Sequence, residues 1–170
     1  MENRSGSSGR RGGFGSRGSR WPDGQRGARA PGSAPTRSYI ESSEYLRGGY
    51  LDESGNLRPE VIITQAQQVV KELTERDSGL KYAQLRRFFT RMRNIESLLA
   101  AGHGFDSVKA KIASLEAAAA DAVNRRVAPR VFEVLMKENV RLALQGPRQF
   151  EAMVDHFESI VCYYPRQSGE

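Results

Sequence analysis

Apolar side chains recur every three or four residues along most of the chain after residue 58, and residues 81–99 give the clearest example. Because an α-helix turns by about 100° per residue, positions with this spacing lie on one side of the helix. The pattern therefore predicts an amphipathic helix whose apolar side faces a core. Its apolar positions are Leu85, Phe88, Phe89, Met92, Ile95 and Leu99.

Four further segments have the same periodicity, and short breaks separate them. The first of the five helices begins at Pro59, because proline favours the first helical turn. Asp106 and Ser107 are both plausible caps for the start of the third. The breaks and starts that delimit the helices are residues 77–79, residues 102–104, Pro129 and residues 146–147.

The apolar positions of these four helices define the faces that we expect to be buried. They are Ile62, Ile63, Ala66, Val69, Val70 and Leu73 on the first; Val108, Ile112, Leu115, Ala119, Ala122 and Val123 on the third; Val131, Phe132, Leu135, Met136, Leu142 and Ala143 on the fourth; and Phe150, Met153, Val154, Phe157, Ile160, Val161 and Tyr164 on the fifth. No segment shows convincing strand alternation, and the short connections favour antiparallel neighbours. We predict an all-α fold, a compact five-helix bundle at residues 58–165.

The first third of the chain has a different composition. Residues 1–38 are rich in arginine, glycine and serine and nearly lack aliphatic side chains, so we predict a disordered tail. Residues 39–57 read as a partly ordered linker whose tyrosines either dock on the bundle or remain loose. Residues 166–170 form a short C-terminal tail.

Charge is unevenly distributed along the chain. The whole chain has 26 basic and 20 acidic residues, but residues 1–38 contain eight arginines against only two acids. The excess positive charge therefore belongs to the tail, and the bundle must bind a polyanion through local arrangement of its side chains. The tail either contacts RNA through its arginines and the rings of Phe14 and Trp21, or only solubilises the protein.

The sequence gives no indication of catalysis. His103 and His156 have no metal-ligand partner at a recognisable spacing, and we interpret both as structural or surface residues. No nucleotide-binding or nucleophile motif occurs in a suitable context, so we expect no enzyme activity, no cofactor and no metal. Cys162 is the only cysteine, which excludes an intrachain disulfide, and we expect it to be buried. No run is apolar enough to predict a membrane span, and we expect a cytoplasmic protein.

Basic side chains beside the buried faces are the candidate RNA contacts. On the second helix Arg86 and Arg93 lie on one flank of the apolar stripe, and Arg87 and Arg91 lie on the other. Each could instead face solvent or form a local ion pair, which is the ordinary role of a charged helix flank. The full candidate set is Lys81, Gln84, Arg86, Arg87, Arg91, Arg93, Lys111, Arg125, Arg126 and Arg130.

Two segments carry a family resemblance. AQLRRFF followed by RMRNIE in the second helix, and FEAMVDHFESIVCYY at residues 150–164, resemble the small all-helical subunit of type III-A CRISPR interference (Csm) complexes. The resemblance covers residues 58–165, with Gln84, Leu85 and Arg86 at the family's Q-L-R positions. Asp121 and Ala117 depart from the tyrosine and proline of the family's third helix, which leaves Arg125 as the candidate there.

The resemblance implies a specific role. Such subunits have no active site, stack in several copies beside the backbone subunits that hold the guide RNA, and bind the guide–target backbone without reading sequence. The implied partners are the guide and target strands, the backbone and large subunits, and further copies of this chain. The alternative is a helical protein–protein adaptor with a flexible, RNA-binding tail.

Overall fold

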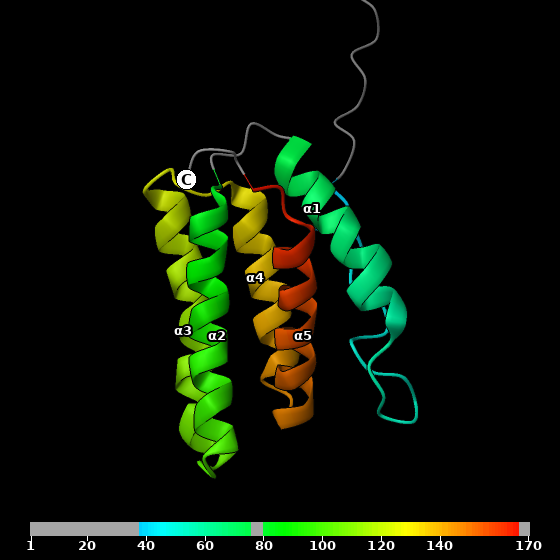
Figure 1. Ribbon diagram of the computed structural model, residues 1–170, viewed down its shortest axis with the longest axis vertical. Coiled ribbons are helices and arrows are strands. Elements are labelled where there is room, and N and C mark those ends of the chain that lie inside the picture. The colour runs from blue at the N-terminus through cyan, green and yellow to red at the C-terminus, as the bar shows by residue number, and fades with distance from the viewer. Residues whose placement is uncertain (1–37, 76–79, 167–170) are drawn as a thin grey trace, which may run out of the picture. The chain divides into compact units, whose positions relative to one another are not determined.

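The computed structural model describes residues 38–75 and 80–166 (Figure 1). The predicted disorder at residues 1–38 and the tail at 166–170 concern positions that, apart from Ser38 and Arg166, lie outside the described residues. The described part of the chain is all-α and contains no strand, which confirms the predicted fold class. Its elements are a π-helical turn Val61–Gln65, α1 Ala66–Glu75, α2 Tyr82–Ala100, α3 Phe105–Asn124, α4 Arg130–Ala143 and α5 Pro147–Tyr163.

Helices α2 to α5 form an antiparallel bundle. Each of these four helices packs on two neighbours, in the cyclic order α2, α3, α4, α5, while α1 packs against the outside of α5 (Figure 1). Short turns join them, so that the start of α2, the end of α3, the start of α4 and the end of α5 meet at one end of the bundle. Gly102 ends α2 with a φ of +88°, a left-handed conformation that glycine adopts without strain.

The predicted core is largely confirmed. Leu85, Met92 and Ile95 of α2 are buried, while Phe89 and Leu99 are only partly buried at the edge of the same stripe. On α5 every predicted apolar position is buried. The ring of Phe88 from α2 meets Phe132 from α4 edge-on, with 4.9 Å between ring centres, so the two helices interlock across the bundle.

The buried face of the first helix differs from the prediction. Ile63, expected in the core, is 50% exposed, whereas Val61 is fully buried. The cause is the π-helical turn at Val61–Gln65, which has more residues per turn than an α-helix and so rotates the preceding positions relative to α1. Gln65 consequently lies inside, where its Oε1 accepts the Leu46 N–H at 3.3 Å.

Residues 38–57 pack on the bundle through their aromatic side chains. Tyr45 and Tyr50 are buried, so the tyrosine docking that the sequence left open does occur for these two. Tyr50 Oη donates to Asn139 Oδ1 at 2.5 Å, and Asn139 Nδ2 donates to Tyr45 Oη at 2.7 Å. Since the Tyr45 oxygen accepts that bond, its own proton points to His156 Nε2, 3.0 Å away. His156 Nδ1–H then donates to the Val61 carbonyl at 2.9 Å, which fixes the neutral tautomer.

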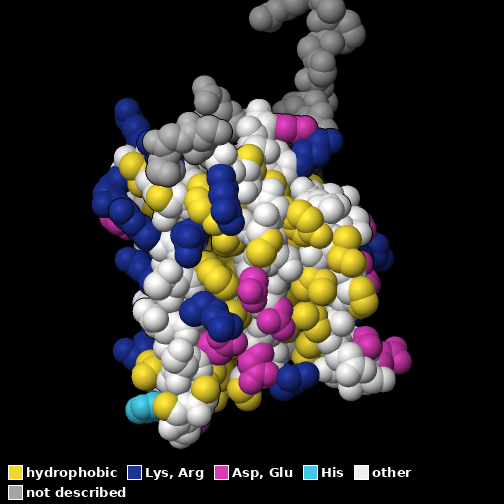
Figure 2. All heavy atoms as spheres, viewed as in Figure 1, with side chains coloured by type: hydrophobic (Ala, Val, Ile, Leu, Met, Phe, Trp, Pro, Cys, Tyr) yellow, Lys and Arg dark blue, Asp and Glu magenta, His cyan; other side chains and the backbone are white. Residues whose placement is uncertain are grey.

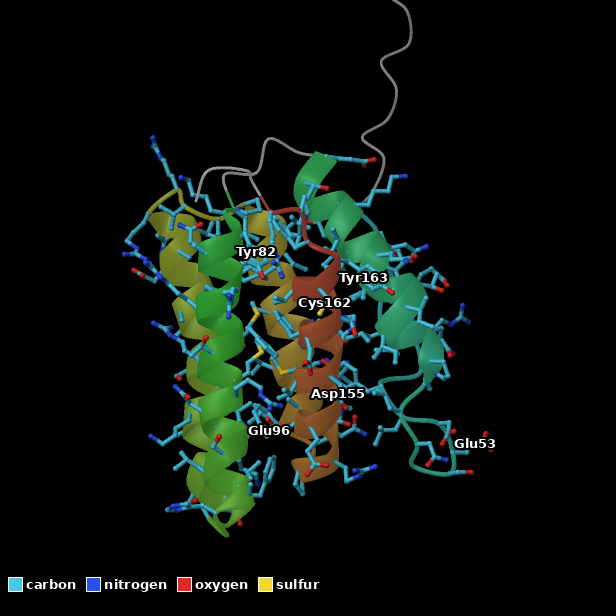
Figure 3. The ribbon with its side chains drawn as sticks, viewed as in Figure 1. Glu53, Tyr82, Glu96, Asp155, Cys162 and Tyr163 are labelled. Atoms are coloured by element: carbon cyan, nitrogen blue, oxygen red, sulfur yellow. The ribbon has the colours of Figure 1, made fainter. Side chains whose placement is uncertain are left out.

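Cys162 is exposed, contrary to the prediction that it is a buried small residue. At about 100° per residue it points away from the side of the helix on which Val161 and Tyr164 are buried, so it lies on the outer side of α5. Figure 3 labels it beside Tyr163, which is itself 44% exposed. Among the described helices, none is both long and apolar enough to cross a membrane.

Candidate nucleic-acid interface

Helix α2 is held in place by its buried face and by a polar contact at its first turn. The backbone N–H of Lys81 donates to Gln84 Oε1 at 3.1 Å, which satisfies a group that the helix start leaves without a partner. The oxygen of Gln84 therefore has a capping role. The buried stripe of α2 then fixes the direction of the arginines on either side of it.

The flank of α2 that faces α3 carries Arg87 and Arg91. Both side chains are exposed, and neither forms an ion pair with any residue in the described part of the chain. The Arg91 guanidinium lies 5.8 Å from the centre of the Phe88 ring, which holds it against the helix. These two arginines are one helical turn apart, about 6 Å along the axis, so they can contact neighbouring phosphates.

A hollow of about 130 Å³ lies between α2 and α3 beside these arginines. Gln84, Arg87 and Arg91 line it from α2, and Arg125 lines it from the end of α3. The structure thus brings together four of the predicted site residues, although Arg125 lies more than thirty positions after the other three in sequence. Asp121 also reaches the rim, where its carboxylate pairs with Arg125 at 3.1 Å. Both partners of this pair are mostly exposed, so the pair holds Arg125 only weakly.

The other flank of α2 faces α5, and its two arginines have different surroundings. Arg86 lies with its guanidinium carbon 6.0 Å from the centre of the Tyr82 ring. Arg166, which follows α5, lies 5.6 Å from the same ring centre. Two guanidinium groups therefore share one aromatic ring at the end of the bundle. Sequence reasoning missed Tyr82 and Arg166, because only the antiparallel topology shows that the end of α5 meets the start of α2.

Arg93, in contrast, lies among acidic side chains. It pairs with Glu96 at 2.6 Å, and the carboxylates of Asp155 and Glu151 are near enough to interact with the same groups. Burial raises the pKa of Glu96, as do these two carboxylates, while Arg93 lowers it. Burial likewise raises the pKa of Asp155. Acidic side chains gather between α2 and α5 in Figure 2, and Figure 3 labels Glu96 and Asp155 there. Arg93 is thus locally neutralised and separate from the α3-facing arginines.

The remaining candidates are exposed and lie mostly at one end of the bundle. Lys81 precedes α2, Arg126 follows α3, and Arg130 begins α4, so the turns collect them near Arg125. Arg126 has a left-handed backbone with φ of +58°, as is usual for the residue after a helix end. Lys111 lies on α3 about 21 Å along the axis from Arg125 and does not join the cluster.

Figure 2 shows the resulting charge distribution on one face of the bundle. Lys and Arg side chains gather over α2, α3 and their shared end, and acidic side chains gather between α2 and α5. We call the exposed Arg87, Arg91 and Arg125, together with the partly buried Gln84, the α2–α3 arginine flank. No group of three or more His, Cys, Asp or Glu side chains within residues 38–75 and 80–166 is arranged to hold a metal ion.

The described residues thus form a small all-α bundle with exposed guanidinium groups along one flank. The family model described as Csm2 Type III-A matches residues 56–170, and the chain belongs to this family. It is therefore a small subunit of the type III-A CRISPR effector complex, a multi-subunit assembly, and the resemblance noted in the sequence is confirmed. No curated protein and no solved structure matches the chain significantly. The segment that carries Tyr45 and Tyr50 precedes the matched region.

Proposed function

We propose that this subunit is non-catalytic and binds the backbone of the guide–target RNA through the α2–α3 arginine flank, which stabilises bound target RNA. The observation that supports the proposal most strongly is the state of Arg87 and Arg91. Both are exposed, both are free of ion pairs with the described residues, and both are fixed by a helix whose other face is buried. Guanidinium groups of this kind bind phosphate oxygens with paired, charge-assisted hydrogen bonds.

Binding of this kind does not depend on base sequence. Contacts to phosphate and sugar position a protein on RNA, whereas sequence is read through the edges of the bases. Arg125 adds a third cation to the flank, and Lys81, Arg86, Arg126 and Arg130 extend the positive surface over the adjacent end of the bundle. Arg93 and Lys111 contribute less, because Arg93 is neutralised by Glu96 and Lys111 lies apart.

The proposal also covers where the subunit works and which other subunits it contacts. The subunit works in the cytoplasm, beside the backbone and large subunits and next to further copies of itself, and chemistry on the RNA takes place on other subunits. Support comes from membership in the family together with an exposed surface beyond the arginines. Ile63 and Tyr163 are half exposed on the side of α1 and α5, where a protein neighbour can cover them.

A reconstituted effector complex tests the proposal. The full chain is compared with the double charge reversal Arg87→Glu/Arg91→Glu and with a matched control, Arg141→Glu/Arg148→Glu. The control arginines are exposed on α4 and α5 and pair with Glu138 and Glu151. We expect all three proteins to assemble and only the α2 variant to lose retained target RNA. Assembly with unchanged target retention in the α2 variant would overturn the proposal and favour the protein–protein adaptor.

A further inference from the structure

The hollow between α2 and α3 has a composition that phosphate binding alone does not require. Its lining includes apolar side chains, with Leu80 and Phe88 on one side and Ala118, Ala122 and Val127 on the other. Its rim carries the arginine flank. A site for phosphate alone needs only the rim, because a phosphate gains nothing from apolar walls.

The size of the hollow limits what can enter. Its volume is about 130 Å³. An apolar cavity of ~150 Å³ accommodates one benzene molecule, so the hollow is close in size to a site for a single six-membered ring and is too small to enclose a fused purine. Ala118 and Ala122 of α3 line this space with small side chains, so a large apolar side chain at Ala118 would occupy part of it.

The polar groups at the rim suit a nucleotide. Gln84 uses its oxygen to accept the Lys81 N–H, and no described residue accepts a hydrogen bond from its Nε2. An amide N–H so placed can donate to a ring carbonyl of uracil or cytosine. Arg87, Arg91 and Arg125 surround the same opening and can hold the phosphates on either side of the inserted base. Bases also stack on guanidinium planes and aromatic rings, and Arg91 lies over Phe88.

We propose that this hollow binds one unpaired pyrimidine base of the RNA strand that follows the arginine flank. The inference rests on the proposed function, because the flank must first bring the strand to α2. It adds to that function a position where a base, and not only the backbone, contacts the subunit. It also predicts a preference for pyrimidines over purines at that position.

The test separates base binding from phosphate binding. Affinities of the full chain are measured for oligouridylate, for oligoadenylate and for an abasic ribose-phosphate oligomer of the same length and charge. The variant Ala118→Leu fills the hollow without changing charge, and Ala117→Leu is the matched control on the exposed side of α3. Stacking of one base corresponds to ~1 kcal/mol or more, about a five-fold change in affinity.

We expect the wild type and Ala117→Leu to bind oligouridylate at least about five-fold more tightly than Ala118→Leu does. All three proteins bind the abasic oligomer equally. Equal oligouridylate affinities for Ala117→Leu and Ala118→Leu would overturn the inference while leaving the proposed function intact. Loss of abasic binding in Arg87→Glu/Arg91→Glu tests the proposed function separately. If this double variant binds the abasic oligomer as tightly as the wild type does, the proposed function itself fails.

A second measurement uses only the unmodified protein, in case Ala118→Leu does not fold. RNA that contains thiouridine is photocrosslinked to the full chain, and the attached peptides are identified by mass spectrometry. We expect crosslinks in the peptides that contain Phe88 or Ala118. Crosslinks confined to other peptides contradict the inference.

Discussion

We predict that acid destabilises this fold through His156. The side chain is fully buried, accepts the Tyr45 hydroxyl proton at Nε2 and donates its Nδ1–H to the Val61 carbonyl. Protonation would add a second N–H that points at the Tyr45 hydroxyl. That hydroxyl already accepts from Asn139, and it would have to turn its own proton away from its only described acceptor. The network therefore favours the neutral ring.

The size of the effect follows from the pKa of His156, which burial lowers from 6.5 to about 4 although the bond to Val61 opposes the change. Between these values the unfolded chain binds more protons than the folded chain, so stability is constant above about pH 6.5 and falls as the pH falls. The calculated loss is about 2 kcal/mol at pH 5 and about 3 kcal/mol near pH 4. Glu96 and Asp155 act in the opposite direction, because their raised pKa values favour the folded state as they protonate.

Urea unfolding measured by circular dichroism at about pH 7.5 and at about pH 5 tests this account. His156→Gln removes the titrating group, and His103→Gln is the control because His103 is exposed. Comparison of the two variants cancels the contribution of the carboxylates. We expect His103→Gln to lose about 2 kcal/mol more on acidification than His156→Gln does. Equal losses in the two variants would refute the assignment of the acid effect to His156.

Three further predictions concern other parts of the structure. Tyr50→Phe should lower the free energy of unfolding by about 1–3 kcal/mol in the same urea assay, because Asn139 Oδ1 loses its donor inside the core. Cys162 should react with a thiol reagent in the folded protein at nearly the rate seen in urea, since it is exposed; strong protection by folding would contradict its position. Arg93→Glu should weaken RNA binding less than reversal of either arginine on the α3-facing flank, as measured by filter binding, because Glu96 already neutralises Arg93.

The helices themselves were predictable because their apolar periodicity is regular and their breaks contain glycine or proline. The error on the first helix arose where a local detail altered that regularity, whereas Cys162 was misplaced because its residue type was given more weight than its position on α5. The π-helical turn buries Val61 and exposes Ile63, and no simple count of positions at α-helical spacing anticipates an extra residue in a turn. The sequence also could not decide whether residues 38–57 dock on the bundle. Their docking depends on Asn139, a polar residue that apolar periodicity does not assign to a core.

The candidate site was predictable residue by residue and not as an arrangement. Exposed arginines on α2 follow from the helical pattern, but the sequence does not show that Arg87 lies across a hollow from Arg125. Nor does it show that Arg93 pairs with Glu96, because either neighbour at helical spacing could face solvent. The first fact depends on which helices are adjacent, and the order of packing around the bundle is a property of the tertiary structure. The second depends on the side-chain conformations of two residues within α2.

The salt dependence of RNA affinity tests the central claim most directly. Full-length protein is compared with Arg87→Gln/Arg91→Gln and with the control Arg141→Gln/Arg148→Gln on single-stranded RNA over a salt series, so that residues 1–38 contribute equally to every protein. Each phosphate contact to a single strand contributes about 0.7 to the slope of log affinity against log salt, so we predict a slope smaller by about 1.4 for the α2 variant alone. An unchanged slope in that variant would contradict the account.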